Sequence, residues 1–165
     1  MDIYKAFIIL LTVLVLGSQA TAKADDPEVF YSWDTFEADK VASIWLIKRF
    51  IQPEASIKIL PKGEFLENAI AFDTPNADFR RYHDRSTYEC LLAHYAVDDK
   101  KAVHLGKIIH DIEVNLWEEK AFESTREIEK QVLEIIREAE SDEQIIENSL
   151  NYFNRLYDSL EVEQN

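Results

Sequence analysis

The sequence predicts an α+β domain that is predominantly α-helical, with a small early β-sheet followed by a helical body. Short segments with strand-like alternation, bounded by turn residues, occur before residue 80. From residue 86 onward, apolar residues recur at helical spacing. Only Gly63 and Gly106 follow residue 24, which disfavours glycine-rich phosphate loops and complex β-topologies.

The early segments predict three short strands and one helix. A strand is expected near residues 29–33, a second in 56–61, where Ile57 and Ile59 alternate with polar residues, and a third in 69–75. Between the first two, residues 38–52 carry apolar side chains at helical spacing, and Pro53 is expected to end this helix.

The helical body opens with a predicted capping box. Ser86 is followed three residues later by Glu89, the pattern in which each side chain bonds the other residue's backbone N–H at a helix start. We expect this box to begin a helix over residues 87–97. Asp98 is expected to cap the next helix, which has an apolar face of Leu105, Ile109, Ile112 and Leu116.

Two further capping boxes are predicted ahead of the last two helices, at Ser124 with Glu127 and at Ser141 with Gln144. The last two helices are expected to bury Ile128, Val132, Ile135, Ile136, Ile145, Leu150, Phe153, Leu156, Tyr157 and Leu160. The tail at 161–165 is expected to fray.

Residues 1–24 have the layout of a secretory signal peptide. Lys5 precedes an apolar run over residues 6–16, and a small-residue tail ends at Ala22-Lys23-Ala24. The run has about 11 residues, whereas a bilayer span needs roughly 20, so cleavage after Ala24 is favoured over an uncleaved membrane anchor. The prediction is therefore a single periplasmic or secreted domain at residues 25–165, with no membrane association after cleavage.

The charge balance narrows the classes of partner. The chain has 32 acidic and 18 basic residues and a formal net charge of −14. Phosphate binding requires clustered Lys and Arg, so no nucleic-acid partner is expected, and cations or basic partners are favoured. Cys90 is the only cysteine, which excludes an intramolecular disulfide.

Three residues from two predicted helices suggest a metal site. Glu89 either serves only its capping box or also faces a pocket and binds a cation. If His110 and Asp111 turn toward the helix of Glu89, an imidazole and carboxylates meet, a ligand set that suits Fe, Mn or Zn. Cys90 and His94 share a helix face, but two ligands are too few, and a core cysteine with a surface histidine is favoured.

Arg80, Arg81 and Arg85 lie within six residues of an acidic chain. Local ion pairs with Asp78 and Asp84 would explain them, and an oxyanion-binding patch is the alternative, because guanidinium groups match oxyanions. The sequence contains no G-x-S-x-G, H-E-x-x-H, CxxC or P-loop motif. No recognisable catalytic motif therefore identifies an enzyme.

Four ordered segments resemble the C-terminal domain of the ChrB family, the chromate resistance-associated proteins. They are "DKVASIWLIKRFIQPEA" (39–55), "AIAFDTPNADF" (69–79), "DRSTYECLL" (84–92) and "KIIHDIE" (107–113). The resemblance spans about Asp34 to Leu160 and implies a role in chromate or other metal and oxyanion stress, without specifying a reaction.

The resemblance also bears on the candidate site. Glu89, His110, Asp111 and Asp39 match the family's pattern, which supports a shared metal site at these four residues. Ser86 stands where the family usually has Cys. His83 is a secondary candidate, since it can replace a histidine that the pattern carries nearby.

The sequence thus supports an exported protein of the chromate-resistance family that binds a divalent transition metal or an oxyanion. The alternative is a helical protein-interaction module without a small ligand. The protein partner, if there is one, is not specified by the sequence.

Overall fold

The computed structural model describes residues 28–117 and 119–161. The predicted signal peptide lies outside the described residues, as do residues 162–165 of the predicted frayed tail. Among the helices that are described, none is both long and apolar enough to cross a membrane.

The sheet is small and early in the chain, as predicted, and its strands are parallel. Its order is β2-β1-β3, with β1 (Val29–Trp33) in the centre, β2 (Ser56–Leu60) on one side and β3 (Ile70–Ala71) on the other. Phe30 pairs with Ile57 and Ile70. Phe30 and Ser32 are buried on the same face of β1, because alternate side chains of a strand point to one side. The third strand is shorter than expected.

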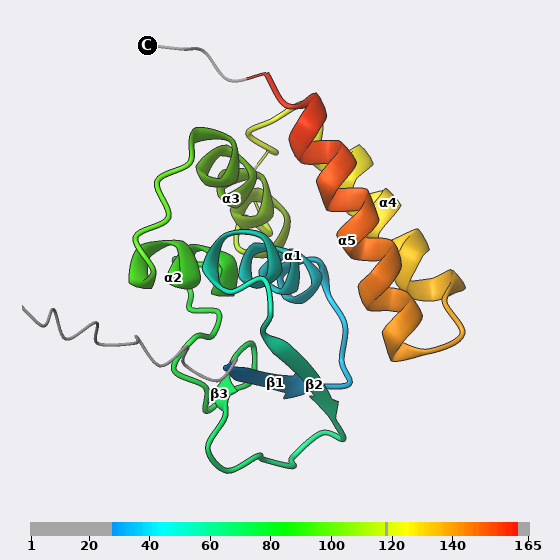
Figure 1. The fold of residues 1–165 in the computed structure, drawn as a ribbon. Helices are drawn as coiled ribbons and strands as arrows, with labels where there is room; N and C mark the ends of the chain where they lie inside the picture. The colour runs from blue at the N-terminus through cyan, green and yellow to red at the C-terminus, as the bar shows by residue number, and fades with distance from the viewer. Residues whose placement is uncertain (1–27, 118, 162–165) are drawn as a thin grey trace, which may run out of the picture.

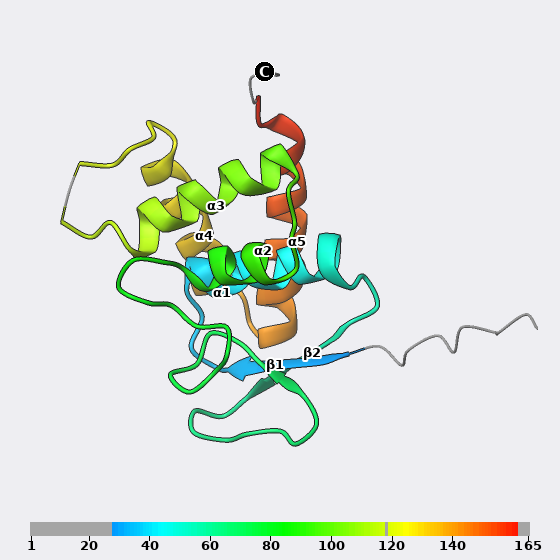
Figure 2. The same ribbon diagram turned by 90° about the vertical axis from the view of Figure 1, so that its left-hand side faces the viewer.

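The helix α1 (Ala38–Leu46) occupies the centre of the molecule (Figures 1 and 2). All nine of its residues are buried, including two that carry charges, Asp39 and Lys40. It lies between the sheet and the other helices, and α5 runs alongside it (Figure 1).

The predicted single helix over 38–52 is wrong in its last turn. Residues Ile47–Ile51 form a π-helix, η1, in which the backbone N–H of Gln52 donates to the carbonyl of Ile47 at 2.8 Å. The wider turn accommodates one extra residue. It lets Phe50 pack edge-on against Trp45 and Tyr157, with ring centroids 5.6 and 5.7 Å apart. The spacing of apolar residues along the sequence does not reveal tertiary packing of this kind.

The helix α2 (Thr87–His94) begins with the predicted capping box. The Ser86 hydroxyl accepts from the backbone N–H of Glu89 at 3.1 Å, and the Glu89 carboxylate accepts from that of Ser86 at 2.8 Å. The helix ends at His94, earlier than expected, because Ala96 adopts a left-handed φ of 50°.

The helix α3 (Lys100–Glu113) differs from its prediction at both ends. Its cap is Asp99, whose side chain accepts from the backbone N–H of Ala102 at 2.9 Å, and not Asp98. It ends before Leu116, which is 64% exposed and does not extend the apolar face. At its middle, Gly106 packs closely on α2: an added Cβ would lie 3.0 Å from Leu92 and 3.2 Å from Tyr88.

The last two helices, α4 (Thr125–Glu138) and α5 (Asp142–Ser159), lie side by side (Figure 1). Only one half of the predicted capping box forms at Ser141: its hydroxyl accepts from the N–H of Gln144 at 3.2 Å, but the Gln144 side chain accepts from the N–H of Glu140. The box at Ser124 is absent, since Ser124 has helical dihedral angles and its side chain makes no capping bond. Ile128, Val132, Ile145 and Phe153 are buried, and the other predicted apolar positions are half-buried.

Candidate functional site

The N-terminus of α2 is capped by a carboxylate from another helix. Asp39 of α1 is fully buried, and its two oxygens accept from the backbone N–H groups of Thr87 at 2.7 Å and Tyr88 at 2.9 Å. A negative charge is favourable at a helix N-terminus. Burial and the nearby Asp73 nevertheless raise the pKa of Asp39 to about 7, against the opposing effect of these two hydrogen bonds.

A second acid, Asp73, whose side chain is 9% exposed, contacts the same helix start. The Thr87 hydroxyl donates to Asp73 at 2.8 Å, and Lys40 Nζ lies 3.7 Å from the other oxygen of Asp73. Lys40 also donates to the carbonyls of Trp33 and Thr35. Burial lowers the pKa of Lys40 and raises that of Asp73, while each group's charge opposes the shift of the other. Lys40 therefore joins β1, α1 and the loop after β3.

Arg81 connects three acids around this core. Its guanidinium donates to Glu113 of α3 at 2.7 Å and to Glu37, and its Nε lies 3.9 Å from Asp39. Burial would lower the pKa of Arg81, but Glu113 and Glu37 raise it. The Glu113 carboxylate also accepts from the backbone N–H of Asp39 at 3.2 Å, so it caps α1.

The carboxylate–imidazole pair predicted from the sequence forms between α2 and α3. His110 Nδ1 lies 2.9 Å from Glu89 Oε2, the oxygen that also accepts from the Ser86 N–H. Gly106 lies one helical turn before His110, and its missing side chain permits the close contact between the two helices. Glu89 therefore caps α2 and also faces a pocket, and the binding of a cation there stays a prediction.

That pocket has a volume of about 600 Å³. Its polar wall contains Glu89, His110, Asp111 and Lys107, and its apolar wall comes largely from the segment after α3. This segment contributes Val114, Leu116, Trp117, Ala121 and Phe122. Trp117 is 94% exposed.

Asp111 lines the pocket, but its carboxylate oxygens are occupied. They accept from the Thr125 hydroxyl at 2.6 Å, from the Ala121 and Phe122 N–H groups at 2.8 and 3.4 Å, and from the Asn115 amide at 2.7 Å. These bonds outweigh the effect of burial and lower the pKa of Asp111. Its observed contacts fix the segment after α3 against the start of α4.

The four predicted metal ligands therefore lie in different surroundings. Glu89 and His110 are in contact, Asp111 shares their pocket, and Asp39 caps α2 but does not line that pocket. In the described part of the chain, no group of three or more His, Cys, Asp or Glu residues converges as a metal site would. Cys90 is buried with its sulfur 3.5 Å from the Arg80 carbonyl, and burial raises its thiol pKa.

The three arginines do not form one patch. Arg80 donates to the Ala77 carbonyl at 2.8 Å and stacks on Tyr82, and Arg85 is exposed. Arg80 and Arg81 do line a cavity of about 310 Å³ that also receives Lys40 and Lys62. In residues 28–117 and 119–161, neither Asp78 nor Asp84 pairs with these arginines; Asp84 is 3.9 Å from His83, which is 93% exposed.

Sequence reasoning missed the charge cluster of Lys40, Asp73, Glu37 and Glu113, in which Lys40 is buried, Asp73 and Glu113 are half-buried and Glu37 is exposed. Lys40 could have been noticed, because it lies among the apolar residues of its helix. A lysine that is buried with such neighbours needs hydrogen-bond acceptors for its ammonium group. No local signal identifies Glu37 or Glu113, because their partner Arg81 is distant in the chain.

The segments that carry the family resemblance meet at the start of α2. Asp39 and Asp73 bind Thr87, Glu89 binds His110, and Glu113 binds Asp39, so one hydrogen-bonded cluster joins all four. Convergence of residues from distant segments is typical of a functional site.

Comparison with known proteins agrees with the family resemblance seen in the sequence. The family model described as "ChrB, C-terminal domain" matches residues 30–160. Protein ChrB of Cupriavidus metallidurans (strain ATCC 43123 / DSM 2839 / NBRC 102507 / CH34) is 40% identical over 78 residues, which cover 46% of this chain and 24% of that relative. No solved structure matches. The chain belongs to the ChrB C-terminal domain family, and this membership implies a function related to chromate resistance.

Proposed function

We propose that the protein binds a divalent transition metal ion through Glu89 and His110, outside the cytoplasm, as part of the response to chromate. The observation that carries the proposal is the 2.9 Å contact between Glu89 Oε2 and His110 Nδ1 at the wall of the 600 Å³ pocket. A carboxylate with an imidazole suits Fe, Mn or Zn.

The separation of the two donor atoms fits a shared ion. Metal–ligand bonds of about 2.1 Å to both atoms give an angle of about 90° at the metal, which corresponds to neighbouring positions of an octahedral ion. The metal would replace the proton between the two side chains. The pocket leaves room for water in the remaining positions, and the net charge of −14 favours the approach of a cation.

We expect Glu89→Gln and His110→Gln each to weaken metal binding by more than about tenfold, because each removes one of two protein ligands. Calorimetric titration of purified protein with Mn²⁺, Fe²⁺, Co²⁺ and Zn²⁺ measures this. Glutamine at position 89 still suits the capping box, so the first variant separates ligation from folding.

Two variants serve as controls. His94→Gln removes an exposed histidine of the same helix, and Ser86→Ala removes the cap without removing a ligand; both are expected to retain metal affinity. The proposal would be contradicted if the protein bound none of these ions and its melting temperature did not change when they were added. That result would favour the helical interaction module.

Export is tested by fractionation of a Gram-negative host that expresses the full chain. We expect a periplasmic protein whose first residue is Asp25, identified by mass spectrometry of the intact chain, because Ala22 and Ala24 meet the requirement of the signal peptidase for small residues. Ala24→Asp should block this cleavage. Wild-type protein that keeps Met1 in the membrane or cytoplasmic fraction would refute export.

A further inference from the structure

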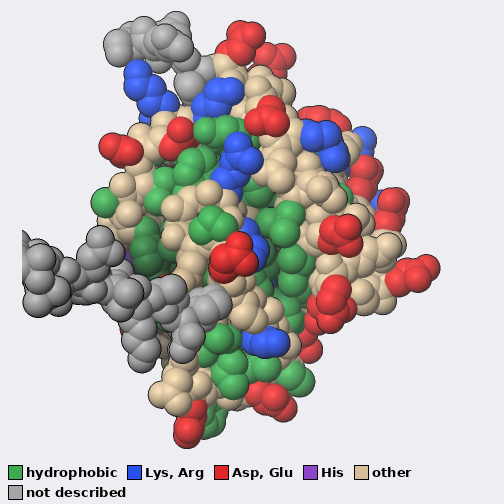
Figure 3. All heavy atoms as spheres, in the orientation of Figure 1, with side chains coloured by type: hydrophobic (Ala, Val, Ile, Leu, Met, Phe, Trp, Pro, Cys, Tyr) green, Lys and Arg blue, Asp and Glu red, His purple; other side chains and the backbone are tan. Residues whose placement is uncertain are grey.

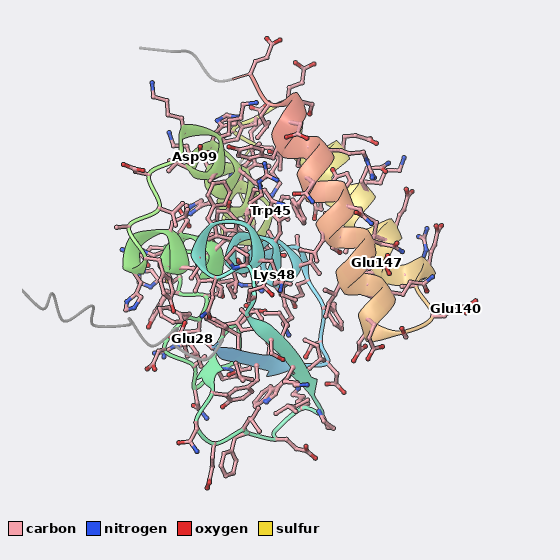
Figure 4. All side chains as sticks on the ribbon, viewed as in Figure 1. Glu28, Trp45, Lys48, Asp99, Glu140 and Glu147 are labelled. Atoms are coloured by element: carbon pink, nitrogen blue, oxygen red, sulfur yellow. The ribbon has the colours of Figure 1, made fainter. Side chains whose placement is uncertain are left out.

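A third cavity lies between η1 and α5 and contains none of the residues discussed as ligands above. Its volume is about 540 Å³, within the range of small-molecule pockets. Trp45 and Lys48 mark its position beside α5 in Figure 4. Its wall is formed by Lys48, Arg49, Phe50, Leu150, Asn154 and Tyr157.

The charged residues on this wall are both basic. Lys48 and Arg49 line the cavity with no acidic residue beside them on the wall, in a chain of net charge −14. Figure 3 shows Lys and Arg side chains near the middle of this face, next to hydrophobic ones, with an acidic side chain also present there and more acidic ones on the right-hand side. The local charge therefore favours an anion.

The π-helix contributes to this arrangement. Lys48, Arg49 and Phe50 are consecutive residues of η1, and all three reach the same cavity. π-Turns are rare and occur frequently at functional sites.

Asn154 supplies a neutral donor in a fixed orientation. Its side-chain oxygen accepts from the Trp45 indole at 2.9 Å and from Arg49 Nη1 at 3.2 Å. These two bonds define which end of the amide is oxygen. The NH₂ group, which has two protons to donate, makes no hydrogen bond to any of the described residues.

The basic groups retain donors as well. Lys48 donates to the Ala55 carbonyl at 3.0 Å, which uses one of its three protons. Arg49 lies 4.0 Å from Asp158, but both side chains are exposed, and such a pair contributes little. An incoming anion therefore competes with only one weak ion pair.

The remaining wall is apolar and aromatic. The Arg49 guanidinium lies 4.7 Å from the centroid of Tyr157 and 6.0 Å from that of Phe50, and Leu150 of α5 also lines the cavity. A tetrahedral inorganic ion would contact only the donors and leave this apolar surface uncovered. A planar apolar body carrying a carboxylate would satisfy both parts of the wall.

We propose that this cavity binds a small organic carboxylate with a planar apolar body, held by Lys48, Arg49 and the Asn154 amide. The site is separate from the Glu89–His110 pair, so this proposal does not depend on the metal proposal.

The indole N–H of Trp45 reports on the site, because it donates to the amide that would bind the ligand. We expect benzoate, added to the ¹⁵N-labelled full chain at constant ionic strength, to shift this resonance saturably at millimolar concentrations. Trp45→Phe assigns the resonance among the three indole signals.

Asn154→Asp is the decisive variant. It keeps an oxygen for Trp45 and Arg49 and replaces the NH₂ donor by a charged acceptor, so benzoate affinity should fall about tenfold or more. Arg49→Gln should also weaken binding, whereas Arg85→Gln, which removes an exposed arginine elsewhere, should not. The proposal is overturned by an absent or non-saturable shift, by unchanged affinity in Asn154→Asp, or by sulfate binding as tightly as benzoate.

Discussion

Replacement of Asp111 by alanine is expected to lower the free energy of unfolding by about 3–5 kcal/mol. The carboxylate is 2% exposed and accepts hydrogen bonds from Thr125, Ala121, Phe122 and Asn115. Its removal would leave several buried donors without an acceptor, and the cost of unpaired buried groups exceeds the small net gain of an ordinary hydrogen bond. Urea denaturation followed by circular dichroism measures the change.

Two further variants define the cause. Asp111→Asn keeps the volume but turns one acceptor into a donor, so it should be destabilised by an intermediate amount. Asp84→Ala removes an exposed acid that lies 3.9 Å from the exposed His83, and it should change the free energy of unfolding by less than about 0.5 kcal/mol. A loss below about 1 kcal/mol in Asp111→Ala would show that water or rearranged side chains replace the carboxylate.

The second large effect concerns pH. The pKa of Asp39 is raised from 3.8 to about 7 by burial and by Asp73. A raised pKa means that the folded state holds its proton more tightly than the unfolded state does. The protonated Asp39 carboxyl therefore makes its full contribution to stability below about pH 4, and this contribution is lost as the pH rises through about 7. Over this window, Asp39 alone would change the free energy of unfolding by roughly 4 kcal/mol.

Neighbouring groups modify this dependence. Burial also raises the pKa values of Asp73 and Glu113, so both act in the same direction. Asp111 acts in the opposite direction: its pKa is lowered, and its contribution is lost when the pH falls into the acidic range where it is protonated. We therefore expect stability to be greatest at mildly acidic pH.

Urea midpoints measured from pH 4 to pH 8 test this, and Asp39→Asn provides the comparison. The variant cannot titrate at position 39, so its stability should fall less steeply as the pH rises. Lysine 40 and Arg81 are unchanged in the variant, which keeps the rest of the cluster in place. Equal slopes in wild type and variant would show that Asp39 remains ionised across this range.

The buried cluster also matters for the proposed metal site. Asp39 and Asp73 hold the first residues of α2, and Glu89 lies on the first turn of that helix. The position of Glu89 relative to His110 therefore depends on charges contributed by α1 and by the loop after β3. These acids act as positioning residues in the proposed site.

Local sequence determined much of the fold and one half of the candidate site. Strand β1 and the capping box of Ser86 with Glu89 lie where they were predicted, because their signals involve residues within one strand or one helical turn. The sequence left open whether His110 faces α2, and the structure places it 2.9 Å from Glu89.

Tertiary structure decided the features that depend on distant residues. The π-turn of η1 accompanies the packing of Phe50 on Tyr157, 107 positions away in the chain, and Arg81 pairs with Glu37 and Glu113 instead of its neighbours. The sequence specified that charged residues were present. Only folding determined which of them are buried together, because the cost of burying a charge is set by partners that local patterns do not reveal.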